Sequence, residues 1–161
     1  MNSTAQHRGS LSFLALSAAI VGLDQLSKFA IERGLAMYQS VTVLPVLEIT
    51  RLHNTGAAFS FLADAAGWQR WLFTALALIV SIVLTLWLSR IERGAKVLAC
   101  AVALILGGAL GNVIDRVRDG AVTDFIKLPL GWPPFNLADM SITLGIVILF
   151  LVIDHARRIV S

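Results

Sequence analysis

Four long apolar runs constrain this chain more than any other feature. They cover residues 11–31, 68–88, 97–114 and 137–153. A helix needs about 20 predominantly apolar residues to cross the hydrocarbon core of a bilayer. Because three more runs follow the first, we interpret the first as a retained span rather than a cleaved signal peptide. The pattern predicts an all-α integral membrane protein with four transmembrane helices, forming a single membrane-embedded domain over residues 1–161.

The composition agrees with lipid as the main solvent. Hydrophobic residues make up 57% of the chain and charged residues 14%, whereas soluble domains carry roughly 25% charged residues. The net charge of +3 comes from basic residues clustered between the apolar runs, as topology signals are, so no nucleic-acid partner is expected. Cys100 is the single cysteine, which excludes an intrachain disulfide and a thiolate metal cluster.

Four spans would place both termini on one side of the membrane. The close basic residues of the turn at 90–96 favour the cytoplasm for that turn and for both termini. Segments 32–67 and 115–136 would then be extracytoplasmic, although the bare count of basic residues on the two sides gives only a weak bias. Short β-branched runs around Pro45 predict a small extracytoplasmic β-sheet in the first of these segments.

Two aspartates flank a proline-bent connector before the last span. Asp124 precedes the connector and Asp139 lies just inside the apolar run that follows it. A carboxylate at the edge of hydrocarbon is costly without a partner or a task. Two carboxylates that meet can share one proton and activate water, as in aspartic proteases, without a metal or cofactor. Asp139 also has a purely structural explanation, since Asn136 would cap the helix in whose first turn Asp139 lies.

Three other polar groups each have two interpretations. Asp24 and Lys28, four residues apart, could form an ion pair that anchors a helix end or could support the active site. The Asn54-Thr55-Gly56 stretch favours a turn, which could also point Asn54 at a ligand.

The third group is the glycine-rich end of the third span. Gly107 and Gly111 favour a close packing seam, which a charge pair at Asp115 or Arg116 could close. Alternatively, Asn112 and Arg116 could form a polar wall beneath a substrate.

Two other classes of function are compatible with these carboxylates. A small ion- or proton-coupled transporter would use Asp24, Asp115, Asp124 and Asp139 as a charge relay. A non-catalytic membrane adaptor would need none of these carboxylates. His53 has no second histidine or cysteine at ligand spacing, so no metal site is predicted.

Five motifs, in this order along the chain, resemble the bacterial lipoprotein signal peptidases, also called signal peptidase II. They are Asp24-Gln25-Leu26-Ser27-Lys28, Asn54-Thr55-Gly56-Ala57-Ala58-Phe59-Ser60, the stretch from Gly107 to Arg116, Thr123-Asp124-Phe125-Ile126, and Phe135-Asn136-Leu137-Ala138-Asp139. Each motif alone is weak, but five in the right order on the right spans are highly specific. The resemblance covers most of the chain.

The resemblance implies a four-helix enzyme of the bacterial inner membrane, with both termini cytoplasmic and an outer sheet that cradles the substrate. The substrate would be a diacylglyceryl-modified prolipoprotein, cut just before its lipidated cysteine by water that an Asp/Asp dyad activates. A monomer in contact with membrane lipid, inhibited by the cyclic peptide antibiotics that target the family, is expected.

The resemblance also implies roles for individual residues. Asp124 and Asp139 would be the catalytic pair. The substrate pocket would comprise Asn54, Gly56, Asn112, Arg116, Asn136 and Ala138, supported by Asp24, Lys28 and Asp115. Two positions depart from the family pattern: Met140 stands where serine is usual and Thr123 where valine is common. Neither departure removes a catalytic group, although Met140 would remove one hydrogen bond near Asp139.

Overall fold

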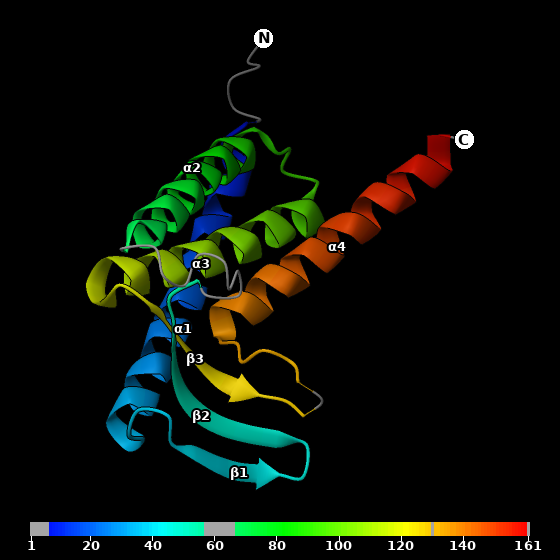
Figure 1. Ribbon diagram of the computed structural model, residues 1–161. Helices are drawn as coiled ribbons and strands as arrows, with labels where there is room; N and C mark the ends of the chain where they lie inside the picture. Colours follow the sequence, from blue (N-terminus) through cyan, green and yellow to red (C-terminus); the bar gives the residue numbers. More distant parts are fainter. Residues whose placement is uncertain (1–6, 57–66, 130, 161) are drawn as a thin grey trace.

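The computed structural model describes residues 7–56, 67–129 and 131–160 and shows four long helices with a small sheet at one end (Figure 1). The helices are α1 (Leu14–Gly34), α2 (Trp68–Arg90), α3 (Lys96–Asp119) and α4 (Leu137–Val160), and a 3-10 helix, η1 (His7–Phe13), leads into α1. The strands are β1 (Ser40–Leu44), β2 (Leu47–Asn54) and β3 (Val122–Lys127). All four helices are long and apolar enough to cross a membrane, which confirms the predicted fold class.

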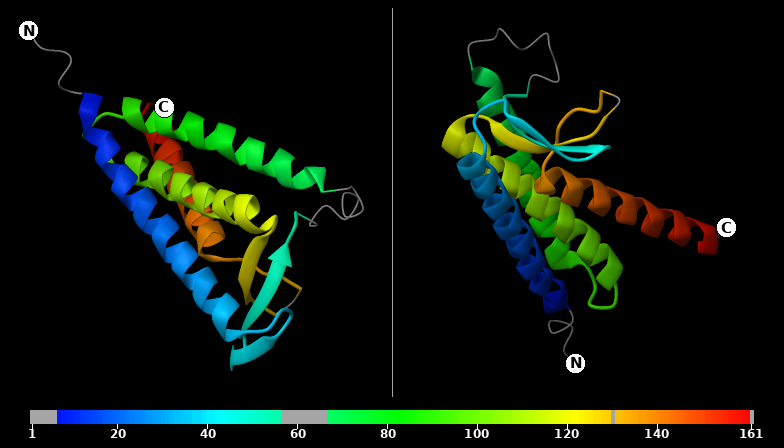
Figure 2. Two further views of the ribbon diagram at one scale, coloured as in Figure 1. Left: turned by 90° about the vertical axis from the view of Figure 1, so that its left-hand side faces the viewer. Right: turned by 90° about the horizontal axis from the view of Figure 1, so that it is seen from below.

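Helix α3 is the centre of the helical bundle. Of its most apolar stretch, 67% is buried inside the protein, against 17–22% for the other three helices. It packs against α1, α2 and α4, and Figure 2 shows it between α1 and α4. The outer helices expose large apolar side chains such as Ile82 and Phe150. Lipid tolerates such surfaces and water does not, as expected for helices within a bilayer.

Glycines allow α3 to approach its neighbours closely. A Cβ atom on Gly107 would lie 2.9 Å from the carbonyl oxygen of Ser17 on α1, and one on Gly111 would lie 2.7 Å from a carboxylate oxygen of Asp24. On another side, a Cβ atom on Gly108 would collide with the carbonyl oxygen of Ala138 on α4. The predicted packing seam is therefore confirmed, and it brings Asp24 and the start of α4 against the same part of α3.

The sheet is antiparallel, with strand order β1-β2-β3. Pro45 lies in the turn between β1 and β2, as the sequence indicated. The third strand is an addition to the predicted sheet, and it contains Asp124, opposite Leu52 of β2. Helix α3 continues to Asp119, beyond the predicted end of its apolar run at 114. Gly120 then ends the helix with φ +81°, a conformation that glycine adopts without strain.

Candidate active site

Asn136 connects the two aspartates that flank the proline-bent connector. Its side-chain amide donates to Asp124 Oδ1 over 2.7 Å. Its backbone N–H donates to Asp139 Oδ2 over 3.3 Å, and the Asp139 N–H donates back to Asn136 Oδ1 over 3.0 Å. The predicted cap of α4 is therefore confirmed, and the same capping residue also holds the carboxylate on β3. The structure brings the two aspartates into one hydrogen-bonded cluster.

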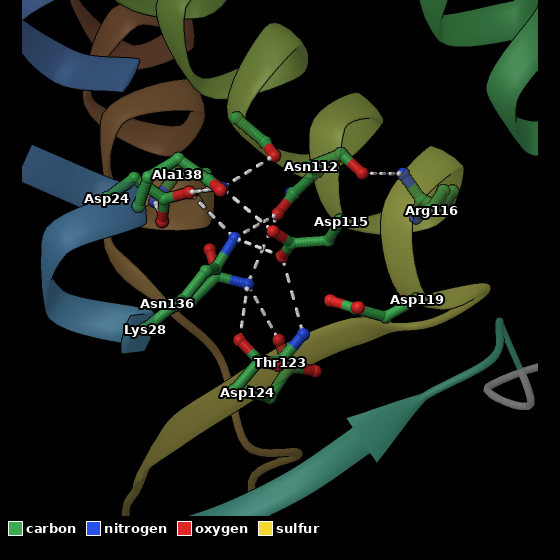
Figure 3. A network of polar contacts seen from close by, with 12 residues as sticks. Asp24, Lys28, Asn112, Asp115, Arg116, Asp119, Thr123, Asp124, Asn136 and Ala138 are labelled. Carbon is green, nitrogen blue, oxygen red and sulfur yellow. Dashed lines mark hydrogen bonds and ion pairs between the residues drawn. The ribbon is translucent and has the colours of Figure 1, made fainter. Parts of the chain in front are cut away.

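The remaining oxygens of the two carboxylates also accept from asparagines. Asn54, at the end of β2, donates from Nδ2 to Asp124 Oδ2 over 2.9 Å. Asn112 of α3 donates from Nδ2 to Asp139 Oδ1 over 2.8 Å. Figure 3 shows Asn136, just before α4, between Asn112 of α3 and Asp124 of β3. Neutral amides orient the carboxylates without cancelling their charge.

Asp124 is almost fully buried, with 3% of its surface exposed. Burial raises the pKa of Asp124 from 3.8 to about 6; the hydrogen bond from Asn54 opposes this rise, and the negative charge of Asp139 adds to it. Asp124 therefore keeps its proton over a wider pH range than an ordinary aspartate.

A buried ion cluster lies beside the asparagines. The Lys28 ammonium is 2.7 Å from Asp24 Oδ2 and 2.6 Å from Asp115 Oδ2, and all three side chains have no exposed surface. The predicted Asp24–Lys28 pair is thus confirmed, with Asp115 as a further partner. Because an isolated charge in such surroundings is costly, the three ions depend on one another.

This cluster is tied directly to the carboxylate site. Lys28 Nζ donates to Asn112 Oδ1 over 3.0 Å, which leaves the amide nitrogen of Asn112 to face Asp139. Asp24 Oδ1 accepts the backbone N–H of Ala138 over 3.0 Å. The ion pair that anchors α1 therefore also positions the first turn of α4. Anchoring a helix end and supporting the carboxylate site, the two roles considered for Asp24 and Lys28, are thus compatible.

Asn54 likewise combines its two interpretations. Its Oδ1 accepts the backbone N–H of Gly56 over 2.9 Å, and Gly56 has φ +92°, so the predicted turn is confirmed. The amide nitrogen of the same side chain donates to Asp124. The ring of Phe73 lies against the bare face of Gly56, where a Cβ atom would come within 2.5 Å of it. Residues 57–60 of this motif lie outside the described part of the chain.

Arg116 does not form the ion pair that the sequence suggested for the glycine-rich end of α3. Its guanidinium lies 5.9 Å from the centre of the Phe73 ring, and its charge interacts with those of Asp139 and Asp124. Asp115 pairs with Lys28 instead. Arg116 therefore borders the two carboxylates from the α2 side of α3.

Sequence reasoning missed some residues that support the site. Gln25 donates to Asp115 Oδ1 over 2.7 Å. The sequence feature that could have indicated this role is a polar residue next to Asp24 within an apolar run. Thr123 donates its hydroxyl hydrogen to Glu32 Oε1 over 2.8 Å and is fully buried. The hydroxyl at this unusual position therefore has a partner that valine could not have.

Met140 is half-exposed, and both oxygens of Asp139 accept hydrogen bonds without a serine at 140.

Within the described residues, no group of three or more histidine, cysteine, aspartate or glutamate side chains is placed to hold a metal ion.

Comparisons with known proteins place this chain in a family. A sequence model of Signal peptidase (SPase) II matches residues 16–154. The chain belongs to the signal peptidase II family. Signal peptidase II is a family of aspartic peptidases, so the chain is an enzyme of that class. The match favours a peptidase over the transporter and the adaptor considered from the sequence.

Curated relatives and solved structures agree with this assignment. The lipoprotein signal peptidase of Ectopseudomonas mendocina is 51% identical over 89% of this chain and 88% of its own length. That of Pseudomonas aeruginosa is 50% identical over 93% of this chain and 92% of its own length. A bacterial membrane enzyme solved by the in meso method at 1.9 Å is 30% identical, with a TM-score of 0.80 over 88% of this chain and 92% of its own. Together with the four apolar helices, this likeness identifies a multi-pass membrane protein.

Proposed function

We propose that the protein is an intramembrane aspartyl endopeptidase that removes the signal peptide from diacylglyceryl-modified bacterial prolipoproteins. Cleavage falls just before the lipidated cysteine, and Asp124 and Asp139 activate the attacking water. The proposal is carried by one observation: Asn136 donates to both carboxylates, 2.7 Å from one and 3.3 Å from the other. Membership of an aspartic peptidase family supports the same chemistry.

The two aspartates have different surroundings and take different roles in the proposed mechanism. Burial favours the protonated form of Asp124. Asp139 lies in the first turn of α4, where its two carboxylate oxygens accept hydrogen bonds from the Asn112 amide and from the backbone N–H of Asn136. Asp124 therefore serves as the acid and donates its proton to the oxygen of the scissile carbonyl, while Asp139, the other member of the pair, takes a proton from water. As the C–N bond breaks, the proton on Asp139 passes to the leaving amine, and Asp124 regains a proton from a hydroxyl group of the tetrahedral intermediate.

The substrate class follows from the relatives, which are named lipoprotein signal peptidases. A lipidated substrate diffuses within the bilayer and enters between helices, while its acyl chains stay in lipid. In this proposal, Asn54, Gly56 and Arg116 form the substrate pocket together with Asn112, Asn136 and Ala138. Binding of the remote lipid helps to position the scissile bond against the dyad.

The same proposal includes where the enzyme acts. It resides in the inner membrane as a monomer, with both termini cytoplasmic and the two aspartates near the outer face. The cyclic peptide antibiotics that target the family would occupy this pocket and compete with the prolipoprotein. The chemistry needs no metal, so a chelator is expected to leave the cleavage rate unchanged.

Single amide substitutions test the dyad. In a cleavage assay with a purified diacylglyceryl-modified prolipoprotein, Asp124→Asn and Asp139→Asn should each abolish release of the signal peptide. Asp119→Asn is the matched control, since Asp119 is an exposed acid at the end of α3 that pairs with Arg118. Cleavage by a correctly folded Asp124→Asn or Asp139→Asn variant would refute the proposed mechanism.

A further inference from the structure

The far end of the sheet carries an exposed apolar surface that the proposed chemistry does not use. Val46, Leu128, Pro129 and Trp132 line one shallow recess there. Val46 is 59% exposed and Trp132 64% exposed. We call these four residues the apolar rim. Large apolar side chains gathered on a surface outside the helices mark a contact with another apolar phase or molecule.

Two distant segments build the apolar rim. Val46 comes from the turn between β1 and β2, whereas the other three residues come from the proline-rich loop after β3. Glu48 and Lys127 are opposite each other in the sheet register and form an ion pair of 2.9 Å just inside the rim. This pairing fixes the turn and the loop beside each other, so the rim is a built surface.

The sheet lies beside the end of the helical bundle. In Figure 1, the β1–β2 hairpin begins beside the C-terminal end of α1 and runs across that end of the bundle, so that its turn lies below the loop that precedes α4. That end of α1 carries Arg33 stacked 4.7 Å over the ring of Phe29. The start of α2 carries Arg70 stacked 4.8 Å over Trp71. Aromatic residues with adjacent cations are typical of helix ends at the boundary between lipid and water.

We propose that the apolar rim inserts into the membrane leaflet at the C-terminal end of α1, as a lipid contact separate from the four spans. Its occupant is the phospholipid bilayer. Trp132 and the aliphatic and proline side chains around it are the residues expected at the headgroup boundary. Because β3 contains Asp124 and ends at Lys127, next to Leu128, this contact would fix the height of Asp124 relative to the lipid.

Depth-dependent fluorescence quenching tests this contact in vesicles without substrate. In a Cys100→Ala background, Val46→Cys and Trp132→Cys are each labelled with an environment-sensitive dye and reconstituted in phosphatidylcholine vesicles. We expect quenching by lipids with a nitroxide near the headgroup and protection from iodide in water. Arg93→Cys, in the exposed turn between α2 and α3, is the control and should be quenched by iodide. Iodide quenching of both rim probes without nitroxide quenching would overturn the proposal.

Two further experiments distinguish a lipid contact from a contact with a second copy of the chain and test the role of Trp132. If a second copy of the chain covered the rim, protection from iodide would disappear when protein is diluted at constant lipid, and this result would overturn the proposal. Trp132→Glu should weaken nitroxide quenching of the Val46→Cys probe, whereas Trp132→Phe should preserve it. Equal quenching in both variants would contradict insertion of the apolar rim into the leaflet. Asp139→Asn should leave all quenching unchanged, so the test does not depend on the proposed peptidase mechanism.

Discussion

Lys28 brings a positive charge into a part of the protein that has no exposed surface, and it holds two aspartates there. Lys28→Met should destabilise the protein by about 3–5 kcal/mol, because Asp24 and Asp115 would lose their cation while still buried. Thermal unfolding in mixed micelles measures the effect.

Arg158→Met is the matched control for Lys28→Met. It removes an ion pair with Asp154 at the same i,i+4 spacing, whose arginine side chain is 77% exposed. Exposed pairs of this kind contribute about 0–1 kcal/mol. Equal destabilisation by the two substitutions would mean that the buried cluster does not stabilise the protein as described.

Asp124 should make stability depend on pH. Its pKa rises from 3.8 to about 6 on folding. Between about pH 4 and pH 6 the folded protein keeps this proton and the unfolded chain releases it, so the free energy of unfolding falls as pH rises through this window. The total contribution is up to about 3 kcal/mol.

The measurement compares unfolding of the protein and of Asp124→Asn across this pH range. The difference in unfolding free energy between them should change by a few kcal/mol and level off above about pH 6. A difference that stays constant with pH would mean that burial does not favour the protonated form of Asp124.

The local part of the site could be predicted at the level of single residues. Asn136 as a cap and Asp139 in the first turn follow from three-residue spacing, and the structure has both contacts. The bond from Asn136 to Asp124, and that from Lys28 to Asp115, could not be derived in this way. They depend on how β3 and α1 pack against α3 and α4, which residue spacing does not encode.

At the scale of elements, the contact between α3 and α4 positions Asn112 against Asp139. Gly108→Ala should destabilise the protein by about 1–3 kcal/mol and reduce cleavage, because the added methyl group would collide with the Ala138 carbonyl oxygen. Unfolding and cleavage rates measure both effects.

Gly22→Ala provides the control for Gly108→Ala. Gly22 also lies within a helix, α1, but a Cβ atom there would have no atom within 4 Å. It should stabilise the protein by about 0.5–1 kcal/mol through helix propensity alone. If both glycine substitutions behaved alike, close packing of α3 on α4 would not be what holds Asn112 and Asp139 together.

The elements differ in how strongly the sequence signals them. Long apolar runs identify the four helices because lipid demands about 20 apolar residues. They do not mark where a helix ends in polar residues, so α3 extends to Asp119. Strand β3 is six residues long and includes an aspartate and a lysine. Its pairing with β2 defines it as a strand, and that pairing joins segments far apart in the chain.

At the scale of the whole molecule, the placement of lysines and arginines beside the spans sets the expected topology. Arg90, Arg93 and Lys96 lie close together where α2 ends and α3 begins. Basic residues in a short turn between two spans favour the cytoplasmic side of the membrane. This turn therefore supplies the charge asymmetry on which the proposed topology rests.

This asymmetry predicts the direction of insertion. In a Cys100→Ala background, Gly34→Cys at the end of α1 should react with a membrane-impermeant thiol reagent added outside spheroplasts, since Gly34 is exposed and has space for a side chain. Arg93→Cys should react only after the membrane is permeabilised, because its turn faces the cytoplasm in the proposed topology. The opposite pattern would invert the topology and place the two aspartates near the cytoplasmic face, where an exported prolipoprotein would not present its cleavage site.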